Sequence, residues 1–168
     1  IHFVDIVPSL TAHLESLLQK HFSTEDFAQR WQVHCTDVIK IPITAQDKQL
    51  IIIAGVGGEL LIKFIEDLIK QFFEMSLTEP TIEVEFILCP VHYNYQVRQA
   101  LRNNSCTLIG EYIVTENKRF YEVIHVKKQF SVLENTTEAL HEISSTGNTM
   151  WDLSTPSHQQ YLLETVNH

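Results

Sequence analysis

The stretch Gln49–Phe73, QLIIIAGVGGELLIKFIEDLIKQFF, decides the fold of this chain. Apolar residues run without a break from Leu50 to Ala54, the glycine-rich segment Gly55–Gly58 (GVGG) follows, and apolar residues then recur at three- and four-residue spacing up to Phe72. The unbroken run predicts a strand buried on both faces, and the recurrence predicts an amphipathic helix. Open α/β sheets bind ligands at such strand-to-helix turns. The stretch therefore predicts a small-molecule site near Gly55–Gly58.

The composition is that of a globular chain. Its 168 residues are 44% hydrophobic and 20% charged, which predicts one domain with a sizeable core. No apolar run approaches the roughly 20 residues of a membrane helix, and no export signal is visible. The chain begins with Ile1 inside a strand-like run, so we expect it to be an internal piece of a longer protein.

The net charge and the cysteine content limit which binding partners and which cellular compartment we expect. A net charge of −9 disfavours a chain that grips a phosphate backbone unaided, so a polyanionic partner would need a local basic patch or a further segment. Cys35, Cys89 and Cys106 are odd in number and widely spaced, which predicts buried, reduced thiols rather than disulfides. We therefore expect a cytoplasmic location.

Strand-like and helix-like segments alternate along the chain. Predicted strands cover residues 2–6, 31–36, 50–54, 81–89, 106–114 and 119–126, and predicted helices cover 8–22, 59–73, 92–103, 134–143 and a segment from Pro156 onward. A short capped helical turn is also expected at residues 23–26. This order predicts an α/β fold with a mostly parallel, doubly wound sheet closed by an antiparallel hairpin. Residues 1–128 would form the α/β domain and residues 129–168 a helical extension.

Two acidic residues follow predicted parallel strands. Asp5 and Asp37 each stand at the carboxyl end of a strand, where a carboxylate can accept hydrogen bonds from a ribose diol or an exocyclic amine. A solvated loop acid or a helix cap is the alternative for each residue.

The glycine-rich segment matches neither G-x-G-x-x-G nor a P-loop. Three glycines within four residues favour close approach of a ligand to the backbone, although a tight turn that lets the helix pack close to the sheet is the alternative. Cys89-Pro90 ends the next strand at the same edge. His92 follows, and it could donate a hydrogen bond, handle a proton or simply face water. No activating base is identifiable for Cys89, so we do not expect a nucleophilic thiol.

The remaining polar residues carry weaker signals. None of the nine histidines has metal-ligand spacing, so we expect no metal site. Arg98 and Arg102 are four residues apart on a predicted helix and so share a face, which could touch phosphates but more simply faces solvent. The other notable basic residues are Lys118, Arg119, Lys127 and Lys128.

Several of these segments together resemble one family. IAGVGGELL at 53–61, a strand ending at Pro90, HYNYQVRQAL at 92–101 and EYIVTENKRFYEV at 111–123 are similar to the bacterial tRNA adenine-N-1 methyltransferases that modify position 22 of tRNA. The resemblance covers residues 1–128. Residues 143–163 also resemble the segment that leads into the family's C-terminal helices.

The resemblance implies a Rossmann-like methyltransferase that uses S-adenosylmethionine as cofactor and tRNA as partner, without a metal or a membrane. Asp5 would hold the cofactor ribose and Asp37 would lie near the cofactor adenine. The implied cofactor-binding residues are Asp5, Ile6, Asp37, Val38, Ala54 and Gly55. The implied catalytic residues are Gly55, Val56, Gly57, Gly58 and His92, and the implied substrate contacts are Cys89, Pro90, Arg98 and Arg102.

The chain departs from the family pattern at four places. The family's first strand, with its Asp-x-Gly-Ser-Asp-His loop, is absent, so this chain is expected to begin at the second strand. The family's Gly-Asp-Gly is Thr36-Asp37-Val38 here, and its Gln-Pro-Asn is Cys89-Pro90-Val91. The family's C-terminal coiled coil would start about where this chain stops.

The chemistry itself makes few demands on side chains. Nitrogen 1 of adenine carries its own lone pair, so transfer needs alignment more than a strong base, and positioning can supply about 7–11 kcal/mol. The adenine must be unpaired or swung out, because pairing hides that nitrogen. Two alternatives remain: an interaction domain that kept the fold without activity, and a methyltransferase for another substrate.

Overall fold

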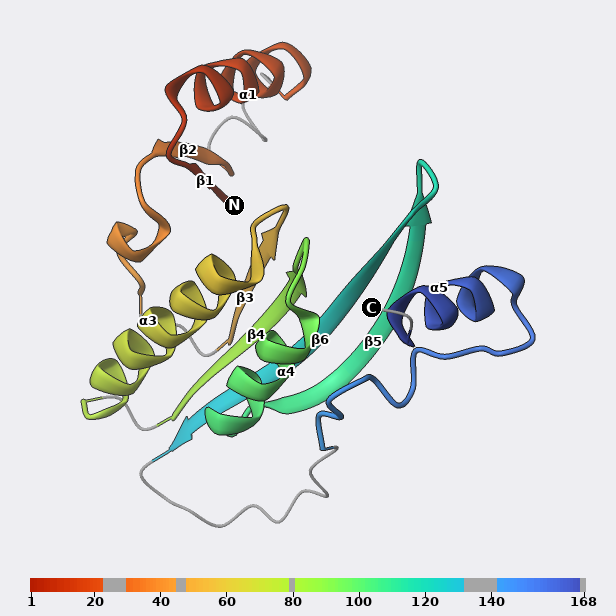
Figure 1. Cartoon of the computed structure of the whole chain (residues 1–168). Helices are drawn as coiled ribbons and strands as arrows, with labels where there is room; N and C mark the ends of the chain where they lie inside the picture. The colour runs from red at the N-terminus through yellow and green to blue at the C-terminus, as the bar shows by residue number, and fades with distance from the viewer. Residues whose placement is uncertain (23–29, 45–47, 79–80, 132–141, 167–168) are drawn as a thin grey trace. The chain divides into compact units, whose positions relative to one another are not determined.

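A computed structural model of the chain describes residues 1–22, 30–44, 48–78, 81–131 and 142–166. The chain divides into two compact units, Ile1–Ile43 and Thr44–His168, and each is described by itself. The α and β elements alternate along the sequence (Figure 1). Among the described helices, none is long and apolar enough to cross a membrane.

The first unit is a small β-α-β arrangement. Strands β1 (His2–Asp5) and β2 (Gln32–Cys35) pair in parallel, and helix α1 (Pro8–His21) contacts both strands. Helix α1 begins at Pro8 because a proline at the first helical position gives up no hydrogen bond. A short 3-10 helix, η1 (Val38–Lys40), follows β2. The helical turn expected at residues 23–26 lies outside the described residues.

The second unit is built on a four-stranded mixed sheet. Its strands are β3 (Lys48–Ala54), β4 (Thr81–Cys89), β5 (Thr107–Glu116) and β6 (Arg119–Ser131), in the order β3-β4-β6-β5. β3 and β4 are parallel, whereas β6 is antiparallel to both β4 and β5. The described strands thus form two sheets, not one, but the α/β class and the closing hairpin are confirmed.

The hairpin between β5 and β6 closes through two residues. Asn117 and Lys118 both have positive φ, 50° and 61°. Two such residues in succession give a turn whose twist matches that of the flanking strands. The turn holds Lys118 and Arg119 at the tip of the hairpin.

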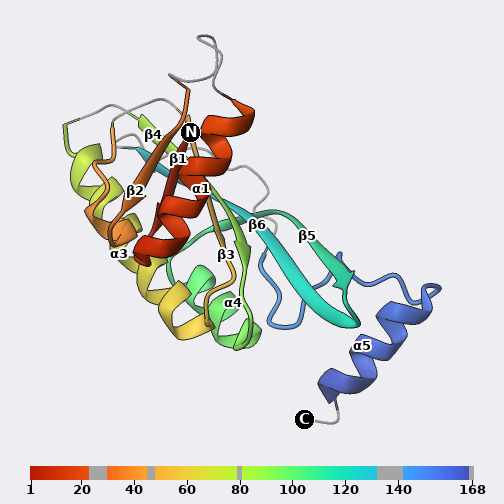
Figure 2. The ribbon, with the colours of Figure 1, turned by 90° about the horizontal axis from the view of Figure 1, so that it is seen from above.

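Two helices supply the core of the second unit. Helices α3 (Gly58–Ser76) and α4 (Asn94–Asn103) contact each other beside the sheet (Figures 1 and 2). The spacing of the apolar residues of α3 places one stripe inward, and alternate residues of β4 face it. The buried residues are Leu61, Ile65, Leu68 and Phe72 of α3 with Ile82, Val84, Phe86 and Leu88 of β4. Burial of each such side chain stabilises the fold by roughly 1.5–3 kcal/mol.

Two expectations for this unit are wrong in detail. Within the described sheet, β3 is not buried on both faces: Leu50 is 56% exposed and Ile52 63%, while Ile53 is 7% exposed. Leu50 and Ile52 lie on one face of β3 and Ile53 on the other, because successive side chains of a strand alternate, and only the face with Ile53 is buried. The helix predicted from His92 begins at Asn94, because Tyr93 adopts a left-handed conformation with φ 62°. The C-terminal helix α5 (Pro156–Val166) is confirmed, and the helix predicted at 134–143 falls largely outside the described residues.

Candidate functional site

The turn between β3 and α3 holds Gly55–Gly58 at the carboxyl end of β3. Gly55 has φ 75°, a conformation that favours glycine, and apart from its two chain neighbours no atom of the described residues lies within 4 Å of the place where its Cβ would be. The Gly55 amide donates to the carbonyl of Cys89 at 3.3 Å, and the Val91 amide donates to the carbonyl of Val56 at 3.1 Å. Two backbone hydrogen bonds therefore join the turn to the end of β4, and the space beside Gly55 remains open.

Gly57 and Gly58, unlike Gly55, have no open space beside them. A Cβ on Gly57 would lie 2.8 Å from His92 Cε1, and one on Gly58 would lie 2.5 Å from the carbonyl oxygen of His92 and 2.7 Å from Tyr93 Cβ. The glycine content predicts that other atoms approach the backbone closely. At Gly57 and Gly58 they do, and these atoms belong to His92 and Tyr93 of the protein itself. Only Gly55 offers a ligand open space in place of a side chain.

The side chain of His92 is exposed and has two close neighbours. Its ring packs against Gly57 and meets the Tyr93 ring edge-on, with centroids 4.7 Å apart and planes at 84°. The left-handed backbone of Tyr93 turns the chain into α4 just after this contact. The imidazole is thus beside the β3–α3 turn, as the sequence predicts, and its role there stays a prediction.

The end of β4 offers no nucleophile. Pro90 is buried and Cys89 is half-buried. Burial raises the pKa of the Cys89 thiol, which keeps it protonated near neutral pH. The described cysteines are all free, but Cys35 is exposed and Cys89 and Cys106 are only partly buried, so the expectation of three buried thiols is wrong. Burial raises the pKa of Cys106 to about 11.

Asp5 and Asp37 lie at one edge of the first unit's sheet. β1 and β2 are parallel with Asp5 beside Cys35, so Asp37 follows at the same end. Asp5 Oδ1 accepts a hydrogen bond from the Val7 amide at 2.8 Å, and Asp37 Oδ1 accepts one from the Ile39 amide at 3.2 Å. Both acids therefore cap their own loops with one oxygen. Neither second oxygen has a hydrogen-bond partner among the residues described.

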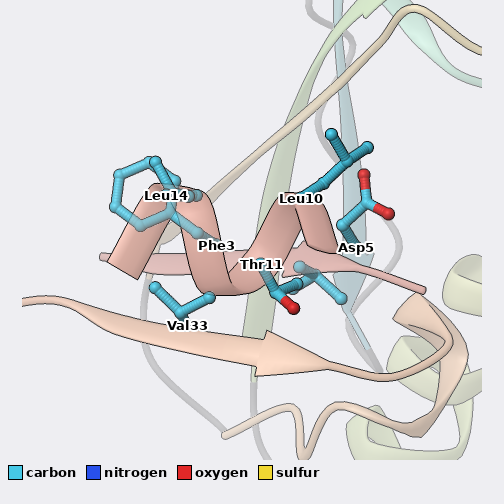
Figure 3. Close-up of a pocket in the computed structure, with 7 residues that line it drawn as sticks. Phe3, Asp5, Leu10, Thr11, Leu14 and Val33 are labelled. Carbon is cyan, nitrogen blue, oxygen red and sulfur yellow. The ribbon is translucent and has the colours of Figure 1, made fainter. Parts of the chain in front are cut away.

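A small pocket opens next to Asp5. It has a volume of about 260 Å³ and lies between α1 and the strands of the first unit. Figure 3 shows Asp5 at one end beside Leu10, with Phe3 and Leu14 at the other. Its walls are almost entirely apolar, so Asp5 supplies the main polar group of this pocket.

Arg98 corrects the expectation of a solvated basic face. It is 1% exposed, whereas Arg102 is exposed and pairs with Glu142 at 3.2 Å. Arg98 Nη1 donates to Glu111 Oε2 at 2.6 Å, and its Nη2 donates to Glu122 Oε2 at 2.8 Å. A buried guanidinium held by two carboxylates is unavailable to a phosphate. Arg98 is therefore a structural residue in this arrangement, not a substrate contact.

The Arg98 cluster, defined as Arg98, Glu111 and Glu122, also holds the C-terminal segment. Glu111 Oε1 accepts the amides of Asn148 and Thr149, and Glu122 Oε1 accepts the Tyr161 hydroxyl at 2.8 Å. Burial alone would raise the pKa of Glu111, but the Thr149 amide and the Arg98 guanidinium outweigh it, so the pKa is lowered. Burial, followed by the Glu122 carboxylate, raises the pKa of Tyr161 well above its usual range.

A larger groove lies beside Gly55 in the second unit. It measures about 570 Å³, and its walls include Gly55, Val91, Lys118, Arg119, Phe120 and Tyr161. The sequence analysis named Lys118 and Arg119 only as notable basic residues, and it assigned no role to Tyr161. The hairpin turn, which places two cations and an aromatic residue in succession, was the signal that could have identified this wall. No cluster of potential metal ligands occurs in the part of the chain that the structure describes.

The fold and the site geometry agree with the comparison to known families. The family model described as a methyltransferase domain matches residues 1–124, so the chain belongs to the methyltransferase-domain family. A search of curated proteins finds no match.

Three solved structures illustrate the likeness. Sp1610 of Streptococcus pneumoniae, a candidate tRNA (m1A22) methyltransferase in complex with S-adenosyl-L-methionine, matches 99% of this chain and 68% of its own, with TM-score 0.67 and 16% identity. M. capricolum TrmK, in complex with S-adenosyl-homocysteine, matches 99% and 66%, with TM-score 0.66 and 13% identity. The B. subtilis M1A22 tRNA methyltransferase TrmK matches 74% and 48%, with TM-score 0.57 and 21% identity. The chain thus spans about two thirds of the first two structures, and the likeness establishes the Rossmann-like methyltransferase fold.

Proposed function

We propose that this protein transfers a methyl group from S-adenosylmethionine to nitrogen 1 of an adenine in tRNA, at position 22. The observation that carries the proposal is the match over 99% of the chain to structures named as enzymes of this activity, one holding the methyl donor and another its product. The methyltransferase-domain family and the open turn at Gly55 support it. Residues 1–128 would act as the methyltransferase domain and residues 129–168 as its extension, in the cytoplasm where tRNA is found.

Each unit by itself contains residues that suit part of the donor. Asp5 and Asp37 keep one carboxylate oxygen each for an outside donor, and a ribose diol and an exocyclic amine are such donors. Ile6 and Val38, next to these acids, would line the same edge. In the second unit, Ala54 and Gly55 present backbone with open space at Gly55. When bound, the donor supplies an electrophilic methyl group on a sulfonium.

The protein's own part in the reaction is positioning. Cys89 is not a base or a nucleophile, because its raised pKa keeps the thiol protonated. Adenine nitrogen 1 brings its own lone pair, so no residue needs to remove a proton before attack. His92, exposed and beside Gly57, would orient the base by a hydrogen bond. Of the two arginines considered as substrate contacts, only Arg102 is exposed enough to meet RNA.

Donor binding is the first test. Titration calorimetry of the purified protein with S-adenosylmethionine should give a saturable signal, and Asp5→Asn should weaken the affinity about tenfold, because a charged acceptor is replaced by a neutral one. Glu15→Gln on the exposed side of α1 is the matched control and should bind like the wild type. A protein that binds no donor would be an interaction domain, and the proposal would fail.

Substrate class is the second test. The protein should methylate an unmodified tRNA transcript, and free adenosine should be a far poorer acceptor. Donor binding together with transfer to a small molecule alone would identify a methyltransferase for another substrate.

A further inference from the structure

We infer that the groove beside Gly55, lined by the hairpin tip and α5, binds an unpaired RNA nucleotide with its phosphate. This inference rests on the proposed function and adds a location for the substrate. The volume of about 570 Å³ falls in the range of pockets that bury a small molecule, about 300–1,000 Å³. All of its lining residues belong to the second unit, so the site is defined within one compact body.

The aromatic wall of the groove can offer a base the ring face of Phe120, because Tyr161 already stacks with both Phe120 and Trp151. The rings of Phe120 and Tyr161 stack with centroids 5.0 Å apart and planes at 25°, and Trp151 stacks on Tyr161 at 5.7 Å. The Tyr161 hydroxyl is held by Glu122, so this wall is anchored to the Arg98 cluster. Bases of any type stack on such side chains, which is how proteins hold unpaired nucleic acid.

Two cations stand at the rim. Lys118 and Arg119 are exposed, and neither forms an ion pair with any described residue. In a chain of net charge −9, Lys118 and Arg119 form a local positively charged patch beside the aromatic wall. Glu164 also lines the groove and could accept a hydrogen bond from a base amine, as carboxylates do. The pairing of cations with a stacking surface suits a nucleotide and its phosphate.

A polar atom behind the wall lacks a partner. The Asn94 amide nitrogen donates to the Tyr161 hydroxyl oxygen at 3.3 Å, and its Oδ1 is buried with no hydrogen-bond partner among the described residues. Because this oxygen is buried and Asn94 is not among the residues that line the groove, it is no ligand contact; Asn94 instead helps to hold Tyr161 in place. The open side of Gly55 lines the same groove, which places the bound base next to the proposed point of transfer.

RNA binding to the whole chain tests the inference. The probe is a fluorescently labelled five-nucleotide oligoadenylate, followed by anisotropy at several salt concentrations. The double variant Lys118→Gln, Arg119→Gln should weaken binding about tenfold and reduce the salt slope by roughly 0.7 for each phosphate that the protein no longer neutralises. Phe120→Leu keeps an apolar side chain but removes the stacking face, and should weaken binding about tenfold without changing the salt slope.

Lys63→Gln, Lys70→Gln on the exposed side of α3 is the matched control, since it removes the same charge away from the groove, and should bind within twofold of the wild type. Thermal unfolding of each variant checks that the fold is kept. If the groove variants bind the oligonucleotide like the wild type, the groove inference is overturned, and intact donor binding would leave the proposed function standing. Absent donor binding would instead count against the proposed function alone.

Discussion

The β3–α3 turn and the Arg98 cluster both join distant segments of the second unit, but by opposite means. At the turn, Gly57 and Gly58 lack side chains, so the His92 ring packs against Gly57 and the His92 carbonyl and Tyr93 Cβ pack against Gly58. In the Arg98 cluster, three charged side chains from α4, β5 and β6 meet in the protein interior. The turn depends on glycines that have no side chain, whereas the Arg98 cluster depends on ion pairs between buried side chains.

The difference predicts how each junction fails. Adding a side chain at Gly58 disrupts the turn, because the His92 carbonyl cannot move aside without moving the segment that follows β4. Removing Arg98 breaks the cluster, because two carboxylates are then left without their cation in a dry environment. The turn borders the proposed site, whereas the cluster holds the segment that carries Tyr161.

Replacement of Arg98 should have the largest effect. Arg98→Met keeps much of the side-chain volume but leaves Glu111 and Glu122 without their cation, and such a loss costs about 3–5 kcal/mol. Urea unfolding measures the free energy of unfolding. Arg102→Met is the control and should cost less than about 1 kcal/mol, since its pair with Glu142 is exposed. Equal stabilities of the two variants would show that the cluster does not hold the unit together.

Filling the turn should come next. Gly58→Ala places a methyl group against the main chain of His92 and should cost about 2 kcal/mol, a typical penalty for overpacking. Gly57→Ala meets only the end of the His92 ring, which can rotate away, so it should cost clearly less. Thermal unfolding compares the two. A larger loss at Gly57 would contradict the proposed difference between main-chain and side-chain neighbours.

The link from the cluster to α5 should contribute less. Tyr161→Phe removes the hydroxyl that donates to Glu122 at 2.8 Å, and a hydrogen bond to a charged group is worth about 1.5 kcal/mol. Urea unfolding again gives the difference. Thr165→Val, on the exposed side of the same helix, should change stability by much less. A neutral Tyr161→Phe would mean that α5 is held by ring stacking alone.

The smallest expected effect is on the pH dependence of stability. The folded pKa of Glu111 is lowered, so its contribution to stability is present above its unfolded pKa, about 4.3, and disappears as the pH falls through the folded pKa. The wild type should therefore lose stability on acidification below about pH 4.3, and Glu111→Gln should lose less over the same range. Melting temperatures between neutral pH and about pH 3 test this. Identical pH profiles would contradict the lowered pKa.

The same contrast explains what the sequence could predict. The GVGG turn and the acids after β1 and β2 follow from local patterns, because an unbroken apolar run, a glycine-rich turn and the end of a strand are visible within a few residues. The turn's neighbours were less visible. That His92 and Tyr93 fill the space at Gly57 and Gly58 depends on the left-handed conformation of Tyr93, which no local pattern announces.

The Arg98 cluster was missed because its partners are distant in sequence. Helical spacing places Arg98 on one face with Arg102, but it does not say how far the apolar core extends around α4. A usable signal existed in β6, where Glu122 alternates in register with the buried Ile124 and Val126. A carboxylate on the inward face of a strand needs a cation, and Arg98 was the candidate.

The most direct test of the account is to map the methylated atom. Purified protein, S-adenosylmethionine and an unmodified tRNA are incubated, and the RNA is digested and analysed by mass spectrometry, alongside the same tRNA with guanine in place of adenine at position 22. The account predicts N-1-methyladenine at position 22 in the first tRNA and none in the second. Methylation at another atom or position, or equal methylation of both tRNAs, would contradict it.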